Sequence, residues 1–220
     1  MNEVVLFGIG QIAEVAHFYL TYDSPYEVKA FTVDREFIRD DRFCGLPLIP
    51  FDEVERHFPP SEAAMLIAVG YAGLNSLRRE KYEQAKKRGY QLISYVSSGT
   101  SQWTKPTIGD NCLILEDTTI QPFVHIGNNV TIWSGNHLGH HCRIKDNAFI
   151  SSHVVISGGT EIGENCFLGV NSTFRDHIRV GARCIIGAGA LILEDCEEDG
   201  LYPAVAAARA KIPSSRIKKI

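Results

Sequence analysis

A strict six-residue period governs the second half of the sequence. Every sixth residue from 108 to 192 is large and apolar, fifteen times in succession. If such residues make up about a third of an average chain, the chance probability of this run is on the order of 10⁻⁷. A period of six is too long for a helix stripe and too regular for a strand meander. It predicts a β-solenoid with one short strand per hexad, in which three hexads close a triangular coil and fifteen hexads make five coils.

Two other positions of each hexad are also regular. Gly follows the large apolar residue at 109, 127, 139, 163, 169, 181 and 187, where we expect tight corners with unusual backbone angles. Four residues after the apolar position the side chain is nearly always small or β-branched, and five of the six cysteines occupy this place: Cys112, Cys142, Cys166, Cys184 and Cys196. We expect these five to be free thiols that fill the core. The absence of a CxxC pair in the sequence weakens zinc-ribbon and thioredoxin-like alternatives.

The first hundred residues have a different organisation. Apolar runs at 4–7, 27–33, 65–69 and 91–96 predict strands, and residues 11–20 and 74–88 predict helices. This alternation predicts a small parallel α/β domain over residues 1–96. Residues 97–106 lack periodicity and are expected to be a linker to the solenoid of residues 107–196, after which residues 197–220 form a C-terminal tail.

The first strand is followed by a glycine loop that could approach a ligand. Gly8 and Gly10 precede the first helix, whose free amides could hold phosphate, and Asp34 follows the second strand as a nucleotide-binding acid would. A domain of about 95 residues is short for the two halves that NAD needs, so contact with a nucleotide sugar is favoured. A nicotinamide cofactor and a purely structural glycine turn are the alternatives.

Composition excludes several partners. Lys and Arg number 22 against 26 Asp and Glu, and the net charge of -4 argues against binding to nucleic acid. No apolar run reaches the roughly 18 residues that a membrane span needs, and the first residues lack the basic region of a secretory signal. We therefore expect a cytoplasmic protein without a membrane span.

The order of a short Rossmann-like domain and a hexapeptide solenoid resembles the sialic acid O-acetyltransferase and bacillosamine N-acetyltransferase group of sugar acyltransferases. The matching landmarks are Gly8-Ile9-Gly10, Val33-Asp34, Ala68-Val69-Gly70, the segment from Gly139 to Ile144 and the segment from Ile162 to Ser172. The resemblance covers nearly the whole chain. It implies a left-handed parallel β-helix, acetyl-CoA as co-substrate, no metal, and a homotrimer with active sites between adjacent solenoids.

Acyl transfer from a thioester needs a base to take a proton from the acceptor, and histidine suits this role near neutral pH. By the resemblance, His140 occupies the place of the catalytic histidine. The next residue in the group is usually Asp or Glu, whereas this chain has His141, a neutral neighbour that cannot stabilise an imidazolium as a carboxylate does. Relatives also often have a histidine where this chain has Phe149, and His153 is a candidate to replace it in contacting the acetyl group.

The resemblance also implies binding residues for both substrates. We expect the acceptor and its nucleotide to contact Gly8, Gly10, Asp34, Gly70, Trp133 and Asn136. Trp133 stands where several relatives have Asn, so an altered acceptor pocket with sugar stacking on the indole is expected. For coenzyme A, the candidates are His153, Gly158, Gly169, Gly187, Gly189 and Lys211. Lys211 belongs to a basic C-terminus with Arg209, Arg216, Lys218 and Lys219, which could meet the cofactor phosphates.

The sequence thus favours acetyl transfer to an amino group of a nucleotide-linked deoxyamino sugar. An O-acetyltransferase with a sialic-acid-like acceptor and an inert trimeric scaffold remain as alternatives. A Cys142 nucleophile is disfavoured by its inward position. A zinc site between subunits is disfavoured because no two histidines of the solenoid between 125 and 153 are 18 residues apart, the spacing of stacked coils.

Overall fold

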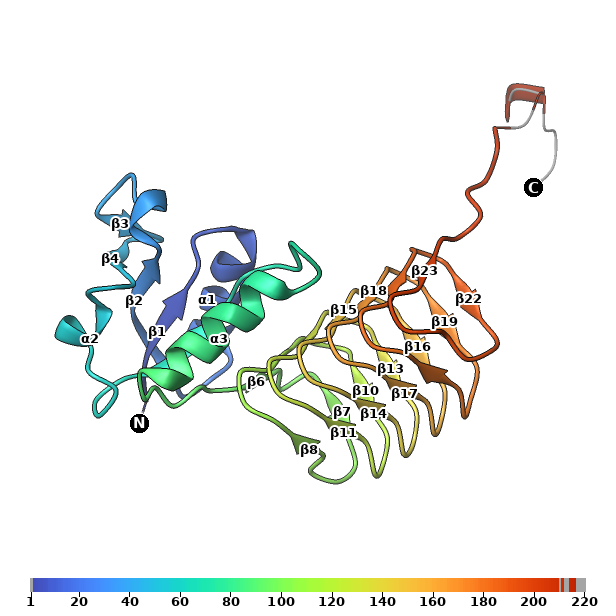
Figure 1. The fold of residues 1–220 in the computed structure, drawn as a ribbon, viewed down its shortest axis with the longest axis horizontal. Helices are drawn as coiled ribbons and strands as arrows, with labels where there is room; N and C mark the ends of the chain where they lie inside the picture. The colour runs from blue at the N-terminus through green and yellow to red at the C-terminus, as the bar shows by residue number, and fades with distance from the viewer. Residues whose placement is uncertain (1, 210, 212–213, 217–220) are drawn as a thin grey trace.

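The computed structural model describes residues 2–209, 211 and 214–216. An N-terminal α/β domain packs against one end of a triangular solenoid, and a C-terminal arm leaves the other end (Figure 1). None of the helices in these residues is long and apolar enough to cross a membrane.

The α/β domain is built on one five-stranded sheet of order β3-β4-β2-β1-β5. Its strands are β1 (Glu3–Phe7), β2 (Glu27–Val33), β3 (Arg42–Phe43), β4 (Leu46–Pro50) and β5 (Ala64–Ile67), of which β3 alone is antiparallel to its neighbour. The helices are α1 (Gln11–Tyr22), α2 (Val54–His57), α3 (Ser76–Lys87) and the short 3-10 turn η1 (Arg35–Phe37). Every residue of β5 is buried, as are all but the first of β1, so both apolar strands are covered on both faces, although β5 is the last strand in the sheet order.

The solenoid has three sheets of two-residue strands. The first, sheet C, faces the α/β domain and contains β6 (Tyr95–Val96), β9 (Leu113–Ile114), β12 (Thr131–Ile132), β15 (Phe149–Ile150), β18 (Phe167–Leu168), β21 (Ile185–Ile186) and β23 (Leu201–Tyr202). Sheet D contains β7 (Ser101–Gln102), β10 (Thr119–Ile120), β13 (His137–Leu138), β16 (Val155–Ile156), β19 (Thr173–Phe174) and β22 (Leu191–Ile192). Sheet E contains β8 (Thr107–Ile108), β11 (His125–Ile126), β14 (Arg143–Ile144), β17 (Glu161–Ile162) and β20 (Arg179–Val180).

Each strand pairs in parallel with the strand of the next coil. Thr131 pairs with Phe149 and Phe149 with Phe167, so the register advances by 18 residues per coil. The second residue of each strand points inward, and the ladder of Ile, Leu, Val and Phe side chains from 114 to 192 forms one continuous core with the five inward cysteines. All six cysteines are free thiols, and only Cys44 is exposed. The predicted solenoid of three hexads per coil is confirmed.

The expected role of the corner glycines is wrong. The seven glycines that follow the apolar residue do not have positive φ; the positive values, from 53° to 75°, fall two residues later at each corner. A Cβ on these seven glycines would instead lie 2.2–2.9 Å from an atom of the following coil, as at Gly163, where it would be 2.6 Å from the backbone nitrogen of Ala182. Glycine is therefore required there because successive coils approach closely, whereas Asn, His or Gly takes the left-handed angle at most corners.

The boundary between the two parts also differs from the expectation. Residues 97–106 were expected to be a linker, but β6 and β7 already pair with β9 and β10 and form the start of the first coil. The final strand expected in the α/β domain at 91–96 contributes only a single bridge, from Leu92 to Met65. At the other end, β23 in the expected tail pairs with β21. The hexad position is Gln102 at one end and Glu198 at the other. Because neither residue is apolar, the sequence pattern did not predict β7 and β23.

The domain and the solenoid are joined by buried polar contacts. Asn111, Asn129 and Asn147 form a side-chain ladder at one corner of the solenoid, with hydrogen bonds of 2.7 and 2.8 Å, and the backbone amide of Ile67 in the α/β domain donates to Oδ1 of Asn111 at 2.8 Å. From α3, Nη2 of the fully buried Arg78 donates to the carbonyls of Asn147 and Ala148, each at 3.0 Å. Burial lowers the pKa of Arg78 because its charge is removed from water. These contacts fix α3 against the solenoid.

Candidate active site

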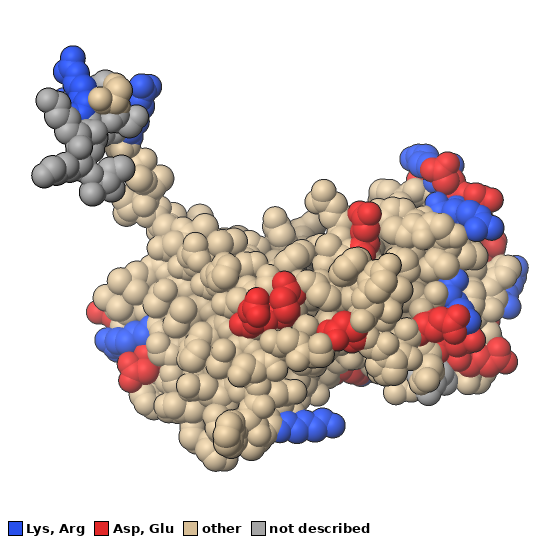
Figure 2. All heavy atoms as spheres, turned by 180° about the vertical axis from the view of Figure 1, so that it is seen from behind, with Lys and Arg blue, Asp and Glu red and all other residues tan. Residues whose placement is uncertain are grey.

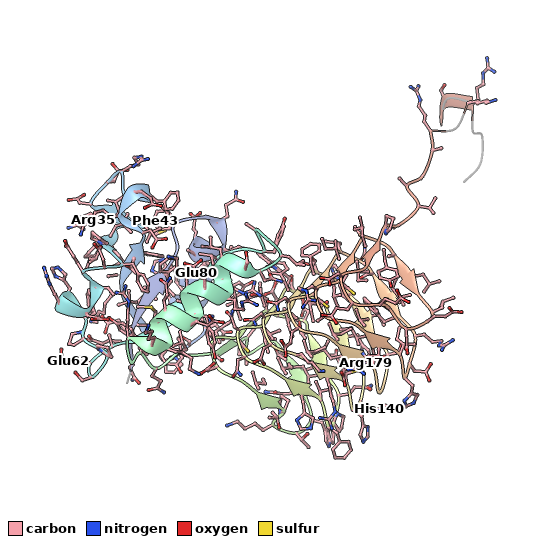
Figure 3. The ribbon with its side chains drawn as sticks, in the orientation of Figure 1. Arg35, Phe43, Glu62, Glu80, His140 and Arg179 are labelled. Atoms are coloured by element: carbon pink, nitrogen blue, oxygen red, sulfur yellow. The ribbon has the colours of Figure 1, made fainter. Side chains whose placement is uncertain are left out.

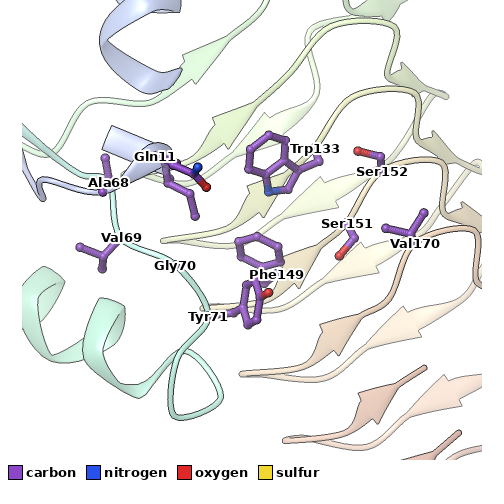
Figure 4. Close-up of a pocket in the computed structure, with 12 residues that line it drawn as sticks. Gln11, Ala68, Val69, Gly70, Tyr71, Trp133, Phe149, Ser151, Ser152 and Val170 are labelled. Carbon is purple, nitrogen blue, oxygen red and sulfur yellow. The ribbon is translucent and has the colours of Figure 1, made fainter. Parts of the chain in front are cut away.

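A cavity of about 540 Å³ lies between the α/β domain and sheet C (Figure 4). We call it the interdomain pocket. The α/β domain contributes the start of α1 and the loop after β5, and the solenoid contributes one corner. Its lining residues are Gly10, Gln11, Ile12, Ala68, Val69, Gly70, Tyr71, Trp133, Phe149, Ser151, Ser152 and Val170. No charged side chain is among them, so the pocket suits a neutral ligand with apolar and hydroxyl groups.

One wall of this pocket is aromatic. The ring centroid of Tyr71 lies 4.9 Å from that of Phe149 and 4.7 Å from that of Phe167, while Trp133 stands beside Phe149 in the same wall (Figure 4). Phe149 is held from behind by Arg78, whose guanidinium carbon is 5.5 Å from the ring centroid. Aromatic faces of this kind stack on the apolar faces of sugar rings.

A second cavity, the N-terminal pocket, has a volume of about 800 Å³ and lies at the carboxyl ends of β1 and β2. It contains the predicted residues Gly8, Gly10 and Asp34, together with Lys81 of α3. Gly10 and Val69 line both cavities, so the two adjoin over the glycine loop. A ligand longer than one sugar could therefore occupy both.

The three predicted glycines of this region differ in their surroundings. A Cβ on Gly8 would lie 2.6 Å from the carbonyl oxygen of Ala68, and its φ of +130° also demands glycine. No atom lies within 4 Å of a Cβ built on Gly10, which leaves open space in front of α1. A Cβ on Gly70 would be 3.3 Å from Ile12. Gly8 thus has a packing role, while Gly10 keeps the cavity open at the helix start, where backbone amides are unpaired.

His140 and His141 lie together at the corner between sheets D and E. Their Nδ1 atoms are 3.1 Å apart, the backbone amide of His140 donates to Oε1 of Gln121 at 2.9 Å, and the His141 ring packs on Phe123 with centroids 4.6 Å apart. A Cβ on Gly158 would lie 2.6 Å from the His140 ring, so glycine in the next coil makes room for this imidazole. Both histidines are exposed, and Figure 3 shows His140 at the edge of the solenoid remote from the α/β domain.

The Nδ1–Nδ1 contact can orient the His140 ring in the absence of an acidic neighbour. One of the two nitrogens must carry a hydrogen and the other must accept it. If His140 donates from Nδ1, its Nε2 holds a free lone pair and is the basic atom. His141 thereby orients the His140 ring, although it supplies no negative charge.

The other predicted residues are distributed over two corners of the solenoid. Gly158 lies with His140, whereas His153, Gly169, Gly187 and Gly189 lie on the corner between sheets C and D, where the exposed His153 ring contacts Gly135. Lys211 is exposed in the C-terminal arm, with the 3-10 turn η2 (Ser214–Arg216) beyond it. Lys218 and Lys219 lie outside the described residues. The structure of one chain does not bring these groups together.

Asn136 occupies a different setting from the one expected. Its side chain is buried, its Oδ1 accepts from the backbone amide of Val154 at 2.8 Å, and its Nδ2 donates to the carbonyl of Trp133. Both polar ends of the Asn136 side chain therefore stabilise the corner that carries Trp133.

The sequence analysis did not predict Tyr71 or Lys81. The position of Tyr71 directly after Gly70, at the carboxyl end of a predicted strand, was the available signal.

The alternative chemistries find little support in this geometry. The Cys142 thiol is buried and donates to the carbonyl of Ser157 at 3.1 Å, and burial raises its pKa. A thiol of this kind is a poor nucleophile. Across residues 2–209, 211 and 214–216, no group of three or more His, Cys, Asp or Glu side chains could hold a metal ion.

Comparisons with known proteins agree with the fold. The family description "Bacterial transferase hexapeptide (six repeats)" matches residues 105–137, 124–158 and 159–194, which lie in the solenoid. A mutant of perosamine N-acetyltransferase from Caulobacter crescentus, solved in complex with CoA and GDP-perosamine, is similar in structure with a TM-score of 0.82. It is 22% identical, and the match covers 91% of this chain and 93% of that one. No curated protein matches the sequence.

The acetyltransferase domain of PglB from Neisseria gonorrhoeae FA1090 is also similar. It is 24% identical with a TM-score of 0.80, and the match covers 89% of this chain and 93% of that one. Its complex with acetyl coenzyme A gives 21% identity and a TM-score of 0.81, over 91% and 95% of the two chains. The predicted fold, a Rossmann-like domain followed by a left-handed parallel β-helix, is confirmed.

Proposed function

We propose that this chain, whose solenoid matches the bacterial transferase hexapeptide description, transfers an acetyl group from acetyl-CoA to an amino group of a nucleotide-linked deoxyamino sugar. The observation that carries the proposal is the pair of adjoining cavities on either side of Gly10, one polar and one aromatic and uncharged. The similar structures, solved with CoA and GDP-perosamine or with acetyl coenzyme A, agree with this assignment.

The two cavities suggest how the acceptor lies. The nucleoside occupies the N-terminal pocket and the diphosphate crosses Gly10, where the first amides of α1 are free to donate. The sugar then enters the interdomain pocket and stacks on its aromatic wall. Gly10 keeps this path open because it has no side chain.

The lining of the interdomain pocket favours an amino sugar over a sialic-acid-like acceptor. A sialic acid carries a carboxylate, and no Lys, Arg or His lines the pocket to pair with it. Burying an unpaired carboxylate is costly, whereas an amine enters the reaction as the neutral base. A deoxy sugar also offers a methyl or methylene group to Val69, Val170 and the aromatic wall.

The active site is completed by a neighbouring subunit. His140 is not among the residues that line either cavity of its own chain. Sheet D, which ends at the corner with His140, has no Lys, Arg, Asp or Glu among its outward residues, which are Ser101, Thr119, His137, Val155, Thr173 and Leu191. Figure 2 shows a broad surface with few Lys or Arg over the solenoid. We assign this surface to the contact between solenoids of a homotrimer, in which His140 of one chain approaches the pocket of the next.

In this arrangement His140 acts as general base. Its Nε2 takes a proton from the amine as nitrogen attacks the thioester carbonyl, the N–C bond forms, and the C–S bond breaks. The proton then passes to the departing CoA thiolate. His153, Gly158, Gly169, Gly187, Gly189 and Lys211 are assigned to the coenzyme, with the glycines admitting its pantetheine arm and Lys211 facing its phosphates. We place the reaction in the cytoplasm, where the free thiols of this chain would persist.

The test follows CoA release from acetyl-CoA with a panel of nucleotide-linked amino sugars and free sugars, including sialic acid, with product masses. We expect release with a nucleotide amino sugar and a loss of about 10² or more in kcat for His140→Ala. His125→Ala is the matched control, because His125 is an exposed histidine on sheet E. Acetyl-CoA binding without release for any acceptor would contradict the proposed acceptor class, and no acetyl-CoA binding would favour an inert scaffold.

A further inference from the structure

The corner between sheets D and E carries a second exposed histidine, to which the proposed reaction gives no role. Asp176 and His177 follow β19, and the register of sheet D places them two coils after His140. Both side chains are exposed, and Nε2 of His177 lies 3.9 Å from Oδ2 of Asp176. A protonated His177 can therefore form an ion pair with this carboxylate. The pair offers a proton donor on the same corner as the proposed base.

Two glycines of the intervening coil, Gly158 and Gly159, separate His140 from His177. The amide of Gly159 donates to the carbonyl of His140 at 2.8 Å, and the amide of His177 donates to the carbonyl of Gly158 at 3.0 Å. A Cβ on Gly158 would lie 2.7 Å from Nε2 of His140, and a Cβ on Gly159 would collide with Nδ1 of His177. The two imidazoles therefore lie against adjacent residues, whose Cα atoms are about 3.8 Å apart.

The space over these two glycines is a gap in a row of side chains, which we call the glycine notch. In four successive coils the corner residue with a left-handed backbone is Phe123, His141, Gly159 and His177, so a side chain is missing only in the third. The coils on either side of the notch are about 9.6 Å apart, which is two strand spacings. Both rings can therefore contact one small group that lies over the glycines.

The backbone at position 177 does not require histidine. His177 has a φ of 57°, and Asn171 adopts the same left-handed conformation with a φ of 59°. Asn is among the residues that enter this conformation most readily. The imidazole is therefore free to serve the chemistry of the notch.

The coenzyme residues assigned above give the notch a direction. Gly169, Gly187 and Gly189 lie in coils that follow His140, toward the end of the solenoid that His177 faces. If the acetyl group lies over Gly158 and the pantetheine arm runs toward these glycines, the sulfur is on the side of His177. The amine then approaches from the side of His140.

We propose that His177, with Asp176 as its positioning residue, is the general acid that protonates the sulfur of the departing CoA. His140 takes a proton from the amine as the N–C bond forms. The C–S bond breaks with its electron pair on sulfur, and the sulfur takes the Nδ1 proton of His177. The proton on His140 then returns to His177 through water, so both rings end the cycle as they began it.

This inference rests on the proposed function, because it takes the thioester to lie beside His140. It divides between two imidazoles the proton transfers that a single base would otherwise make to both sides of the acetyl group. The second transfer matters only when the leaving group needs a proton, which provides the test.

The experiment compares acetyl-CoA with an analogue in which selenium replaces the sulfur, using the panel acceptor that supports transfer by the wild type. A selenol is a much stronger acid than a thiol, so the selenolate departs without a proton. We expect His177→Asn to lower kcat about 10-fold or more with acetyl-CoA and less than about threefold with the selenium analogue. Asp176→Asn should give the same pattern with a smaller loss. Acetylated sugar is measured by mass.

The matched control is Arg183→Asn. Arg183 is an exposed residue of the same coil with a φ of 58°, but it lies at the corner between sheets E and C. This variant should keep the wild-type kcat with both donors, whereas His140→Ala should lose activity with both. His177→Gly, which also suits a left-handed backbone, is a second variant that should repeat the donor dependence of His177→Asn.

The outcomes separate this inference from the proposed function. No transfer by the wild type to any acceptor would overturn both. If the wild type is active but the folded His177 variants lose nothing with acetyl-CoA, His177 is not the acid and the proposed function stands. Equal losses with sulfur and selenium donors would also overturn proton donation, because a role in packing or in binding the coenzyme does not depend on the leaving atom.

Discussion

At the corner that carries His140, a second imidazole, that of His141, stands where the family resemblance leads one to expect an acid. The 3.1 Å contact between their Nδ1 atoms can set the tautomer of His140, but it offers no negative charge to the imidazolium. Sequence alone located both histidines through the hexad register. It could not give the contact between them, because a ring orientation depends on Gly158 in the next coil and on Phe123 beneath His141.

The six cysteines give a prediction at the same scale. Burial raises the pKa of all six thiols, Cys44 included, but Cys44 is exposed to reagent while the five inward thiols are buried. We expect a thiol reagent at mildly alkaline pH to label one cysteine per native chain, Cys44, and all six after denaturation. Peptide mass mapping checks this.

The Cys142→Ala variant extends the test to catalysis. We expect it to keep its activity within about threefold, because the thiol takes no part in transfer. Labelling of Cys142 in the native protein together with loss of activity in the variant would instead favour a cysteine nucleophile.

Among the elements, the first coil of the solenoid depends on α1 as well as on its own strands. The carboxylate of Asp23, just after α1, accepts from the hydroxyl of Tyr95 at 2.5 Å and from the amide of Ser98 at 2.8 Å. Hydrogen bonds from Ser98 and Tyr95 lower the pKa of Asp23 to about 2. The α/β domain therefore completes a coil that has lost the apolar hexad pattern.

This contact predicts a pH-dependent stability. Because the folded pKa of Asp23 lies below its unfolded value, the stabilisation is present above about pH 4 and is lost as the pH falls toward 2. We expect Asp23→Asn to lower Tm by about 2–4 °C at pH 7, allowing for solvent screening. The difference in Tm between the variant and the wild type should become smaller as the pH falls. Thermal unfolding between pH 7 and pH 3 checks this, with Asp41→Asn as an acid-to-amide control. A gap that stays constant with pH would argue against the ionised carboxylate as the cause.

The corner glycines give a second prediction for the coils. A Cβ at position 163 would meet the backbone of the next coil at 2.6 Å, so Gly163→Ala should destabilise the solenoid by about 1–3 kcal/mol. Gly189 has a φ of +74° and open space around it, and Gly189→Asn should be nearly neutral because Asn171 adopts the same conformation one coil earlier. Denaturant unfolding gives the free energy of unfolding of each variant, Gly163→Ala and Gly189→Asn, relative to the wild type. Equal losses in free energy of unfolding would argue against the close approach of coils as the reason for glycine at position 163.

For the whole molecule, the sequence predicted the two-part fold because each part has its own period. It could not predict the interdomain pocket, which depends on how α3 docks through Arg78 and how Tyr71 meets Phe149 and Phe167. Such contacts join residues far apart in the chain and carry no periodic signal. The same holds for Lys81, whose partner Asp34 lies 47 residues earlier.

A site shared between subunits predicts complementation. Gly10→Val should fold, since its φ is -100° and no atom lies near its Cβ, but it should block the nucleotide path. Coexpressed Gly10→Val and His140→Ala chains should recover activity in about one third of the sites of mixed trimers, because a working site takes its pocket and its histidine from different chains. Activity assays on doubly tagged assemblies, sized by light scattering, check this. A mixture as inactive as its parents would place each site within one chain.

The 18-residue register has a consequence for how such a molecule can change its length. A duplication of six residues would carry every later side chain to the next face, and one of twelve would carry it to the face after that; only eighteen restores the original faces. Growth is thus quantised in whole turns, each adding about 4.8 Å to the axis. The distance from His140 to the end of the solenoid can therefore change only in steps of one coil. An extended co-substrate that lies along the solenoid must have a length that fits one of these steps.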